Sequence, residues 1–263
     1  MADYLHLTRD DGVATITIDR PQVRNAIPPG GWEALHDLFD EIARDDAVRV
    51  LVLTGAGEDF CSGADVGGGG RTGDAGRQRT HPLDDMRIVG RSCQTLHTLP
   101  KPTIARVDGV AAGAGLNMAL ACDFVLASDR SRFSEIFARR GLNIDFGGSF
   151  LLPRIVGMQR AKELVMLADV IDAPRALEMG LVNRVVARND LDARVDEFVT
   201  KLLAGPPIAL ATSKKLLNQS FTSTLEEALE AEGIGQAYQF TTADTVEAMT
   251  AFAEKRTPEF KGR

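Results

Sequence analysis

The first two hundred residues alternate between runs typical of strands and segments typical of helices. Residues 13–19 alternate apolar and polar side chains with the period of two of a half-buried strand, whereas residues 48–55 form the continuous apolar run of a buried one. Between them, residues 31–46 carry apolar side chains at helical spacing. Helical patterns also separate three further predicted strands, at 102–111, 123–128 and 181–186. This order predicts an α/β core.

From about residue 158 the pattern becomes almost entirely helical. Helices are predicted at 159–168, 191–204, 208–220 and 223–240, the last with Ser223 or Thr224 as its N-cap. We therefore expect a core over residues 1–204 and a helical region over 205–263 that packs on the core or on a neighbouring subunit. One helical stripe is predicted to be buried between subunits: Leu216, Leu217, Phe221, Leu225 and Leu229.

Composition excludes several classes of function. The formal net charge is -7 and no long basic run is present, so nucleic acid is not an expected partner. The N-terminus lacks the pattern of a signal peptide, and no apolar stretch approaches the roughly 18 residues that span a bilayer. We expect a cytoplasmic protein without membrane contact.

Cysteine and histidine spacing gives no sign of a metal centre. The three cysteines are far apart with no CxxC motif, and the four histidines do not pair at ligand spacing. We expect no metal and no bound cofactor. Residues 66–80 contain six glycines and three arginines, a composition typical of a mobile loop, which leaves both a surface excursion and a functional lid open.

Two glycine-rich turns are candidates for close contact with a ligand. Residues 55–66 leave a buried strand and end in small residues, and residues 109–125 run from a strand end into a helix that is predicted to start near Gly115. The alternative is tight packing of strand against helix. A dinucleotide fingerprint fails, because Met118 occupies the third glycine position.

One carboxylate lies in an apolar turn. Asp145 stands between Ile144 and Phe146, directly before Gly147 and Gly148. An aspartate here can form an Asx-turn. It can also act as a base, because an apolar setting raises the pKa of a carboxyl group.

Several segments, in order along nearly the whole chain, resemble the crotonase superfamily of enoyl-CoA hydratases and isomerases. They are DRPQVRNAI (19–27), GAGEDFCSGADV (55–66), KPTIARVDGVAAGAGLNMALACD (101–123), GLNIDFGGSFLLPRIVG (141–157), RALEMGLVNRVV (175–186) and AFAEKRTPEF (251–260). The resemblance implies a spiral of ββα turns with a C-terminal helical trimerisation region, assembled as a trimer or a dimer of trimers. It also implies that the core binds and processes a coenzyme A thioester.

The resemblance further assigns residues to the two glycine turns. Backbone N–H groups of Ala64 and Ala114 would stabilise the negative charge that develops on the thioester oxygen. Contacts to CoA would come from Val23, Arg24, Ala26, Ser62, Asp65 and Val66, and, across a subunit boundary, from Phe260 and Lys261. Asp65 has a helix cap as its alternative role.

The reaction itself is not fixed by the fold. Hydratases of the superfamily use two glutamates, and the matching residues here are Asn117 and Phe137, neither of which can exchange a proton with water. Glu135 lies two residues from the second position and is interpreted as a solvated residue at a helix start, with a catalytic acid as the alternative. Asp145 matches an aspartate of several isomerases, which favours double-bond or ring-type isomerisation with Asp145 as the proton shuttle. Hydration and silent acyl-CoA binding remain alternatives.

Overall fold

A mixed six-stranded sheet forms the centre of the molecule. The computed structural model describes residues 2–65 and 81–263. The strand order is β1-β2-β3-β4-β6-β9; β1 pairs antiparallel with β2, and the other neighbours are parallel. The strands are β1 (Leu5–Asp10), β2 (Val13–Ile18), β3 (Val50–Gly55), β4 (Thr103–Val107), β6 (Phe124–Ser128) and β9 (Arg184–Val186). The mixed α/β class is confirmed.

A second, smaller sheet holds β5 (Val110–Ala112), β7 (Arg132–Ser134) and β8 (Ile171–Asp172), with β5 parallel to β7. The predicted strand 102–111 is therefore two strands in two sheets. The chain turns at Asp108 and Gly109, where Gly109 takes a φ of +68° and a Cβ would lie 1.9 Å from the carbonyl oxygen of Glu58. Only glycine fits that approach.

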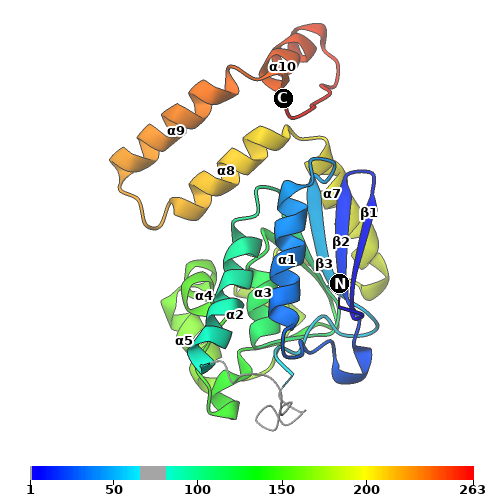
Figure 1. Cartoon of the computed structure of the whole chain (residues 1–263), viewed down its shortest axis with the longest axis vertical. Coiled ribbons are helices and arrows are strands. Elements are labelled where there is room, and N and C mark those ends of the chain that lie inside the picture. The colour runs from blue at the N-terminus through cyan, green and yellow to red at the C-terminus, as the bar shows by residue number, and fades with distance from the viewer. Residues whose placement is uncertain (1, 66–80) are drawn as a thin grey trace.

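Helices cover both faces of the large sheet (Figure 1). The larger core lies on the face covered by α1 (Gly31–Arg44), α2 (Pro82–His97) and α3 (Ala114–Leu120). A smaller core joins Val50, Val52, Ile104 and Leu126 to α7 (Leu191–Leu203) on the other face. Because apolar side chains are buried on both faces, β3 has no alternation, as its sequence predicted. The remaining core helices are α4 (Gly148–Val156), α5 (Met158–Leu167) and α6 (Ala173–Glu178).

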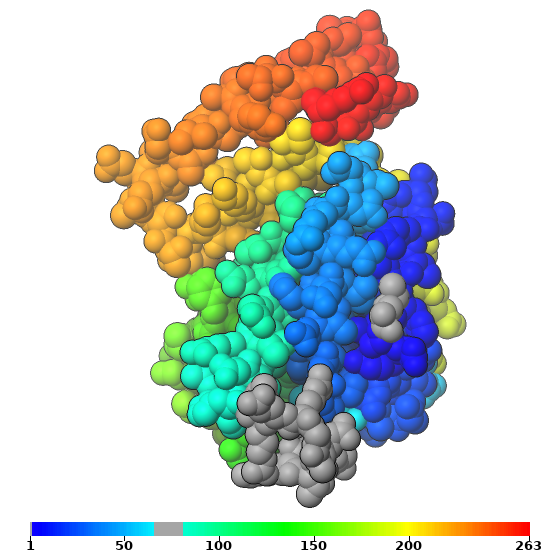
Figure 2. All heavy atoms as spheres, in the orientation of Figure 1, coloured from blue at the N-terminus to red at the C-terminus, as the bar shows by residue number. Residues whose placement is uncertain are grey.

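The last three helices extend from one end of the core (Figures 1 and 2). They are α8 (Pro207–Gln219), α9 (Leu225–Gln239) and α10 (Ala243–Glu254). Thr224, not Ser223, caps α9 and forms a capping box with Glu227. On α8, the nearly buried Lys214 ammonium pairs with Asp123 at 2.8 Å, which fastens this arm to the core. None of the helices in the described residues is long and apolar enough to cross a membrane.

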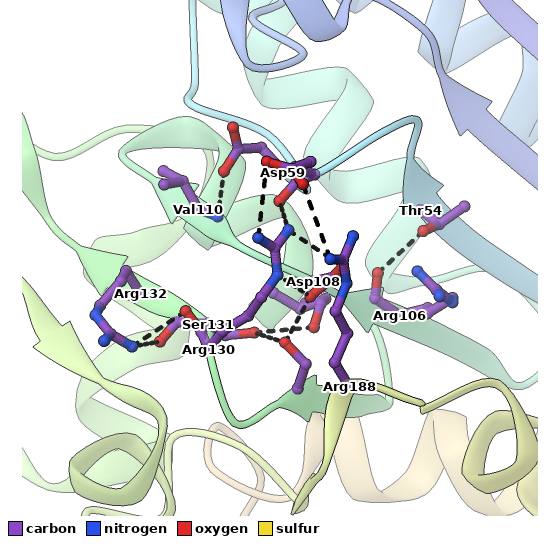
Figure 3. A network of polar contacts seen from close by, with 12 residues as sticks. Thr54, Asp59, Arg106, Asp108, Val110, Arg130, Ser131, Arg132 and Arg188 are labelled. Carbon is purple, nitrogen blue, oxygen red and sulfur yellow. Dashed lines mark hydrogen bonds and ion pairs between the residues drawn. The ribbon is translucent and has the colours of Figure 1, made fainter. Parts of the chain in front are cut away.

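A buried carboxylate fixes the junction between the two sheets (Figure 3). Asp108 accepts hydrogen bonds from Arg130 Nε at 2.7 Å, from Arg188 Nε at 3.0 Å and from the Ser128 hydroxyl at 2.6 Å. Burial alone would raise the pKa of Asp108, but these hydrogen bonds and the two positive charges outweigh it and hold the pKa below its usual value. Arg130 also donates to the backbone oxygen of Glu58. The network thereby orients the turn that follows β3.

Candidate active site

Two turns bring the backbone amides of Ala64 and Ala114 close together. Each amide directly follows a glycine with positive φ, which is +97° for Gly63 and +54° for Gly113. A Cβ on Gly63 would lie 2.9 Å from the Ala112 carbonyl oxygen and 3.4 Å from the Ala114 nitrogen. Glycine is therefore needed for two reasons: it adopts the positive φ, and its missing side chain lets the two turns approach closely.

Both amides lack a backbone acceptor within the described residues. Ala114 is the first residue of α3, so its N–H has no acceptor within the helix. Around Ala64, Ile27 N–H donates to Gly63 O and Asp65 N–H donates to Ile27 O, both at 2.8 Å, which leaves the Ala64 N–H outside this bridge. Within the described part of the chain, neither amide donates to a backbone carbonyl. Two such donors suit a developing oxyanion.

Four of the residues that the resemblance assigns to CoA lie together beside these turns. Ser62 N–H donates to Arg24 O at 3.0 Å, and the Ser62 hydroxyl donates to Val23 O at 3.2 Å. The buried Asn25 side chain joins this segment to the turn after β3 by donating to Ala56 O and Asp59 O. The structure thus brings Val23, Arg24, Ala26 and Ser62 next to Ala64.

Asp65 lies in the same place with its side chain engaged by the protein. Arg20 Nη1 pairs with Asp65 Oδ2 at 3.0 Å and also donates to Ala26 O at 2.6 Å. This ion pair fixes the geometry of the segment around Ala26. Direct contact of Asp65 with CoA and its alternative role as a helix cap both stay predictions, and Val66 lies outside the described residues.

Phe260 and Lys261 lie far from this surface within one chain. Arg49, the residue before β3, donates to Phe260 O at 3.4 Å. The glycine turn is at the opposite end of β3, about 20 Å away along a six-residue strand. The buried Asp244 accepts from the N–H groups of Lys261 and Gly262 at 2.7 and 2.9 Å and holds the tail there. Their predicted role across a subunit boundary stays a prediction.

A polar cluster lies at the end of the site, around Asn117. This residue is one turn along α3 from Ala114 and has no exposed surface. Its Nδ2 donates to the backbone oxygen of Asp145 at 3.0 Å and to Glu135 Oε2 at 3.3 Å. A Cβ on Gly148 would lie 2.4 Å from Asn117 Nδ2, so the contact requires glycine there. Asn117 thereby connects both carboxylate residues to the helix that starts at Ala114.

The interpretation of Glu135 as a solvated residue is wrong. Its side chain has an exposed fraction of 0%. Ser134 O accepts a 2.9 Å hydrogen bond from Gly113 N–H, which holds this end of β7 against the turn of Ala114. No clear signal of this burial is present in the sequence, because β7 has only three residues and Ser134, between Phe133 and Glu135, is buried as well.

Asp145 occupies the first position of a tight turn. Gly148 N–H donates to the backbone oxygen of Asp145 at 2.9 Å, with φ of +45° at Phe146 and +73° at Gly147. The Asx-turn that the sequence left open as an alternative is not formed, because the backbone and not the side chain closes the turn. Phe146 is held in this unfavourable conformation by burial against Trp32, with ring centroids 5.1 Å apart.

Three buried oxygens in this cluster have no hydrogen-bond partner among the described residues: Asn117 Oδ1, Glu135 Oε1 and Asp145 Oδ1. Burial raises the pKa of Asp145 to about 6. Burial also raises the pKa of Glu135 to about 8; the hydrogen bond from Asn117 opposes this shift, and the charge of Asp145 adds to it. At neutral pH the cluster therefore holds one ionised carboxylate and one carboxylic acid.

Apolar groups and one thiol complete the surroundings. Phe137 is buried, and its Cζ would lie 3.6 Å from a Cβ on Gly113, so its ring lies against the turn that precedes Ala114. Burial raises the pKa of the Cys93 thiol on α2 to about 11, and the charge of Asp145 adds to the shift. The described part of the chain contains no group of three His, Cys, Asp or Glu side chains that could hold a metal ion.

The sequence profile of the enoyl-CoA hydratase/isomerase family matches residues 8–263. The chain belongs to this family. It is 34% identical to the 1,2-epoxyphenylacetyl-CoA isomerase of Escherichia coli K12, over 100% of both chains, and 36% identical to the short-chain-enoyl-CoA hydratase of Clostridium acetobutylicum, over 98% of this chain and 97% of that one. The crystal structure of an enoyl-CoA hydratase from Bacillus anthracis superposes with a TM-score of 0.91 at 30% identity, covering 99% of this chain and 100% of that chain. The crotonase resemblance is confirmed.

Proposed function

We propose that this enoyl-CoA hydratase/isomerase family member isomerises an enoyl-CoA or a related acyl-CoA, with Asp145 as the base. The observation that carries the proposal is the unpartnered, buried Asp145 Oδ1, on a turn that Asn117 fastens to the oxyanion helix. A carboxylate with a pKa of about 6 is ionised at neutral pH and more basic than an ordinary aspartate. No cofactor is needed beyond the CoA of the substrate.

The proposed chemistry begins at the carbon next to the thioester. Asp145 removes a proton from C2 of a 3-enoyl-CoA, and the negative charge moves to the thioester oxygen. The N–H groups of Ala64 and Ala114 stabilise this oxygen. Collapse of the dienolate with protonation at C4 gives the 2-enoyl-CoA. The segments around Val23 and Ser62 hold the CoA portion, and Phe137 packs against the acyl chain.

Amide and aromatic side chains at positions 117 and 137 favour isomerisation over hydration. Asn117 and Phe137 cannot activate water, whereas isomerisation needs only proton transfer between carbons. The isomerase from Escherichia coli supports this direction; the relative from Clostridium is named a hydratase and keeps the other direction open.

Rates on two substrate classes test the proposal. We expect 3-enoyl-CoA thioesters to be isomerised, and crotonyl-CoA to be hydrated slowly or not at all. A panel of 2-enoyl, 3-enoyl and aromatic acyl-CoA thioesters, followed by absorbance and mass spectrometry, measures both reactions. Rapid hydration without isomerisation would contradict the proposal, and thioester binding without any turnover would identify a silent acyl-CoA binder.

Hydration is the second candidate because of Glu135. Glu135 is buried beside Asn117, and the charge of Asp145 acts on it. It therefore supplies a second carboxyl group to a site in which residues 117 and 137 have none. Two carboxyl groups can hold and activate a water molecule. Comparing the rates of hydration in Glu135→Gln and in the unmodified protein separates this candidate from isomerisation.

Apolar side chains on the C-terminal arm support a trimer or a dimer of trimers. Four members of the predicted stripe are largely exposed in the single chain: Leu217, Phe221, Leu225 and Leu229. Further apolar side chains of α9 and α10 are also exposed: Ile234, Tyr238, Val246, Met249 and Phe252. An apolar surface of this extent is typical of a subunit interface.

We expect a trimeric or hexameric mass by light scattering at micromolar concentration. Replacing Leu225 and Leu229 together by Glu should shift the mass toward the monomer, because charges would be buried in the interface. The exposed pair Glu226→Gln and Glu230→Gln on the same helix serves as the control. A monomeric unmodified protein would overturn this assignment.

A further inference from the structure

Glu135 has no part in a one-base isomerisation, although it lies in the site. We propose that Glu135 is a second catalytic residue, which gives its proton to C4 of the dienolate while Asp145 takes the proton from C2. This inference rests on the proposed isomerase function and assigns the two proton transfers to two different side chains.

The position of Glu135 is set by a hydrogen bond to its side chain and by the contacts of its neighbours. Its Oε2 accepts from Asn117 Nδ2 at 3.3 Å, and the same amide nitrogen donates to Asp145 O at 3.0 Å. The preceding residue, Ser134, accepts from Gly113 N–H, one residue before the oxyanion donor Ala114. The carboxyl group is thus joined to the oxyanion turn on one side and to the turn of Asp145 on the other.

The cluster contains more acceptors than donors. Asn117 Oδ1, Glu135 Oε1 and Asp145 Oδ1 are all buried and have no hydrogen-bond partner among the described residues, and Asn117 Nδ2 donates the hydrogen bonds that the cluster does contain. A fully ionised pair would leave these acceptors and two like charges together in an apolar setting, which costs free energy. One proton on Glu135 removes a charge and adds a donor.

The pKa values of the two carboxyl groups suit Glu135 as the acid and Asp145 as the base. Burial and the negative charge of Asp145 raise the pKa of Glu135 to about 8, above the value of about 6 for Asp145. Asp145 is therefore the ionised member near pH 7 and Glu135 the protonated one. Two carboxyl groups with separated pKa values commonly divide the roles of base and acid.

The transfer balances without a further reactant. Asp145 accepts the C2 proton, and the C–H electron pair enters the dienolate. As the thioester carbonyl re-forms, the C2–C3 double bond forms and the electron pair of the C3–C4 double bond takes the Glu135 proton at C4. Asp145 is then neutral and Glu135 ionised. Asp145 then gives its proton to solvent and Glu135 takes one from solvent, which restores the starting state.

Hydrogen labelling distinguishes this mechanism from a one-base shuttle. A single base carries the proton from C2 to C4, so deuterium at C2 of a 3-enoyl-CoA would appear at C4 of the product. With two groups, C4 receives hydrogen from Glu135, which exchanges with solvent. We expect unmodified protein in light water to give product with little deuterium at C4. Quantitative transfer of the label to C4 would overturn the inference, and this measurement needs no variant.

The variant Glu135→Gln separates the two steps. We expect isomerisation to fall about 100-fold or more, while C2 deuterium still exchanges into solvent, because Asp145 and the oxyanion donors remain. A merely structural role for Glu135 predicts that exchange and isomerisation fall together. The matched control is Glu163→Gln on α5, whose half-exposed side chain lies in a surface ion pair and should leave both rates unchanged.

These measurements separate a failure of the role of Glu135 from a failure of the proposed isomerase function. Unchanged isomerisation in Glu135→Gln, with normal isomerisation by unmodified protein, overturns the role of Glu135 alone. Joint loss of exchange and isomerisation in a variant with an unchanged melting temperature also overturns it. Failure of the unmodified protein to isomerise or to exchange C2 hydrogen overturns both proposals.

Discussion

Replacing Asp145 by asparagine is expected to reduce 3-enoyl-CoA isomerisation about 100-fold or more without lowering the melting temperature. Asparagine has nearly the same volume but cannot accept the C2 proton. The turn should persist, because the backbone oxygen of residue 145 accepts from Gly148 N–H. Since burial disfavours the charged form of Asp145, the neutral side chain should be at least as stable at pH 7 and above. Isomerisation kinetics and thermal melts of both proteins provide the measurement.

The rate of the unmodified protein should also depend on pH in a defined direction. The raised pKa of Asp145, about 6, leaves the base ionised above that pH, so activity should be lost as the pH falls through it. Glu135 and the Cys93 thiol are the titratable groups that face Asp145, and neither loses its proton near pH 6. Full activity in Asp145→Asn, or an acidic limb that persists unchanged in any residual activity, would remove Asp145 from the mechanism.

Replacing Ala114 by proline is expected to abolish turnover of every thioester substrate. Proline deletes one of the two oxyanion N–H donors, and loss of one such donor typically costs about 3 kcal/mol of transition-state stabilisation, or roughly 100- to 1,000-fold in rate. Residue 114 is the first of α3, a position at which proline is well tolerated in helices. The measurement is kcat on the best substrate, with folding checked by circular dichroism.

The matched control is Ala114→Gly, which removes only the methyl group and keeps the N–H. We expect this variant to retain most of the activity, so the comparison isolates the amide proton from the side chain. A folded Ala114→Pro protein with normal kcat would place the oxyanion donors elsewhere. Equal losses in both variants would point to packing around residue 114 instead.

Hydrophobic periodicity predicted the long elements of the fold and missed the short ones. β2, β3 and α1 each have enough residues to show a clear period, and they lie where the pattern placed them. β7 and β8 have three and two residues, too few for any period, and they form by pairing in space, β7 with β5 and β8 with β7. The break between β4 and β5 depends on the close approach of Gly109 to Glu58, which is a contact between distant parts of the chain.

In the candidate site, the sequence indicated the turns that depend on local backbone conformation. It missed the burial of side chains that depends on packing between distant segments. Small residues after a strand identify the turns of Ala64 and Ala114, because a positive φ at glycine is a local property. The burial of Glu135 depends on Asn117 and on the hydrogen bond from Gly113 to Ser134, which join three separate segments. The alternative of an Asx-turn at Asp145 is not realised for a related reason: Trp32 stabilises a backbone turn at Phe146 that the local sequence disfavours.

The contact between Trp32 and Phe146 also gives the protein an internal optical probe. Trp32 is the only tryptophan in the sequence, and its indole packs against the residue that follows the proposed base. Indole emission responds to the polarity and motion of its surroundings, so intrinsic fluorescence reports on this turn without any added dye. Stopped-flow fluorescence can therefore follow the arrival of an acyl chain in real time and time it against the appearance of product.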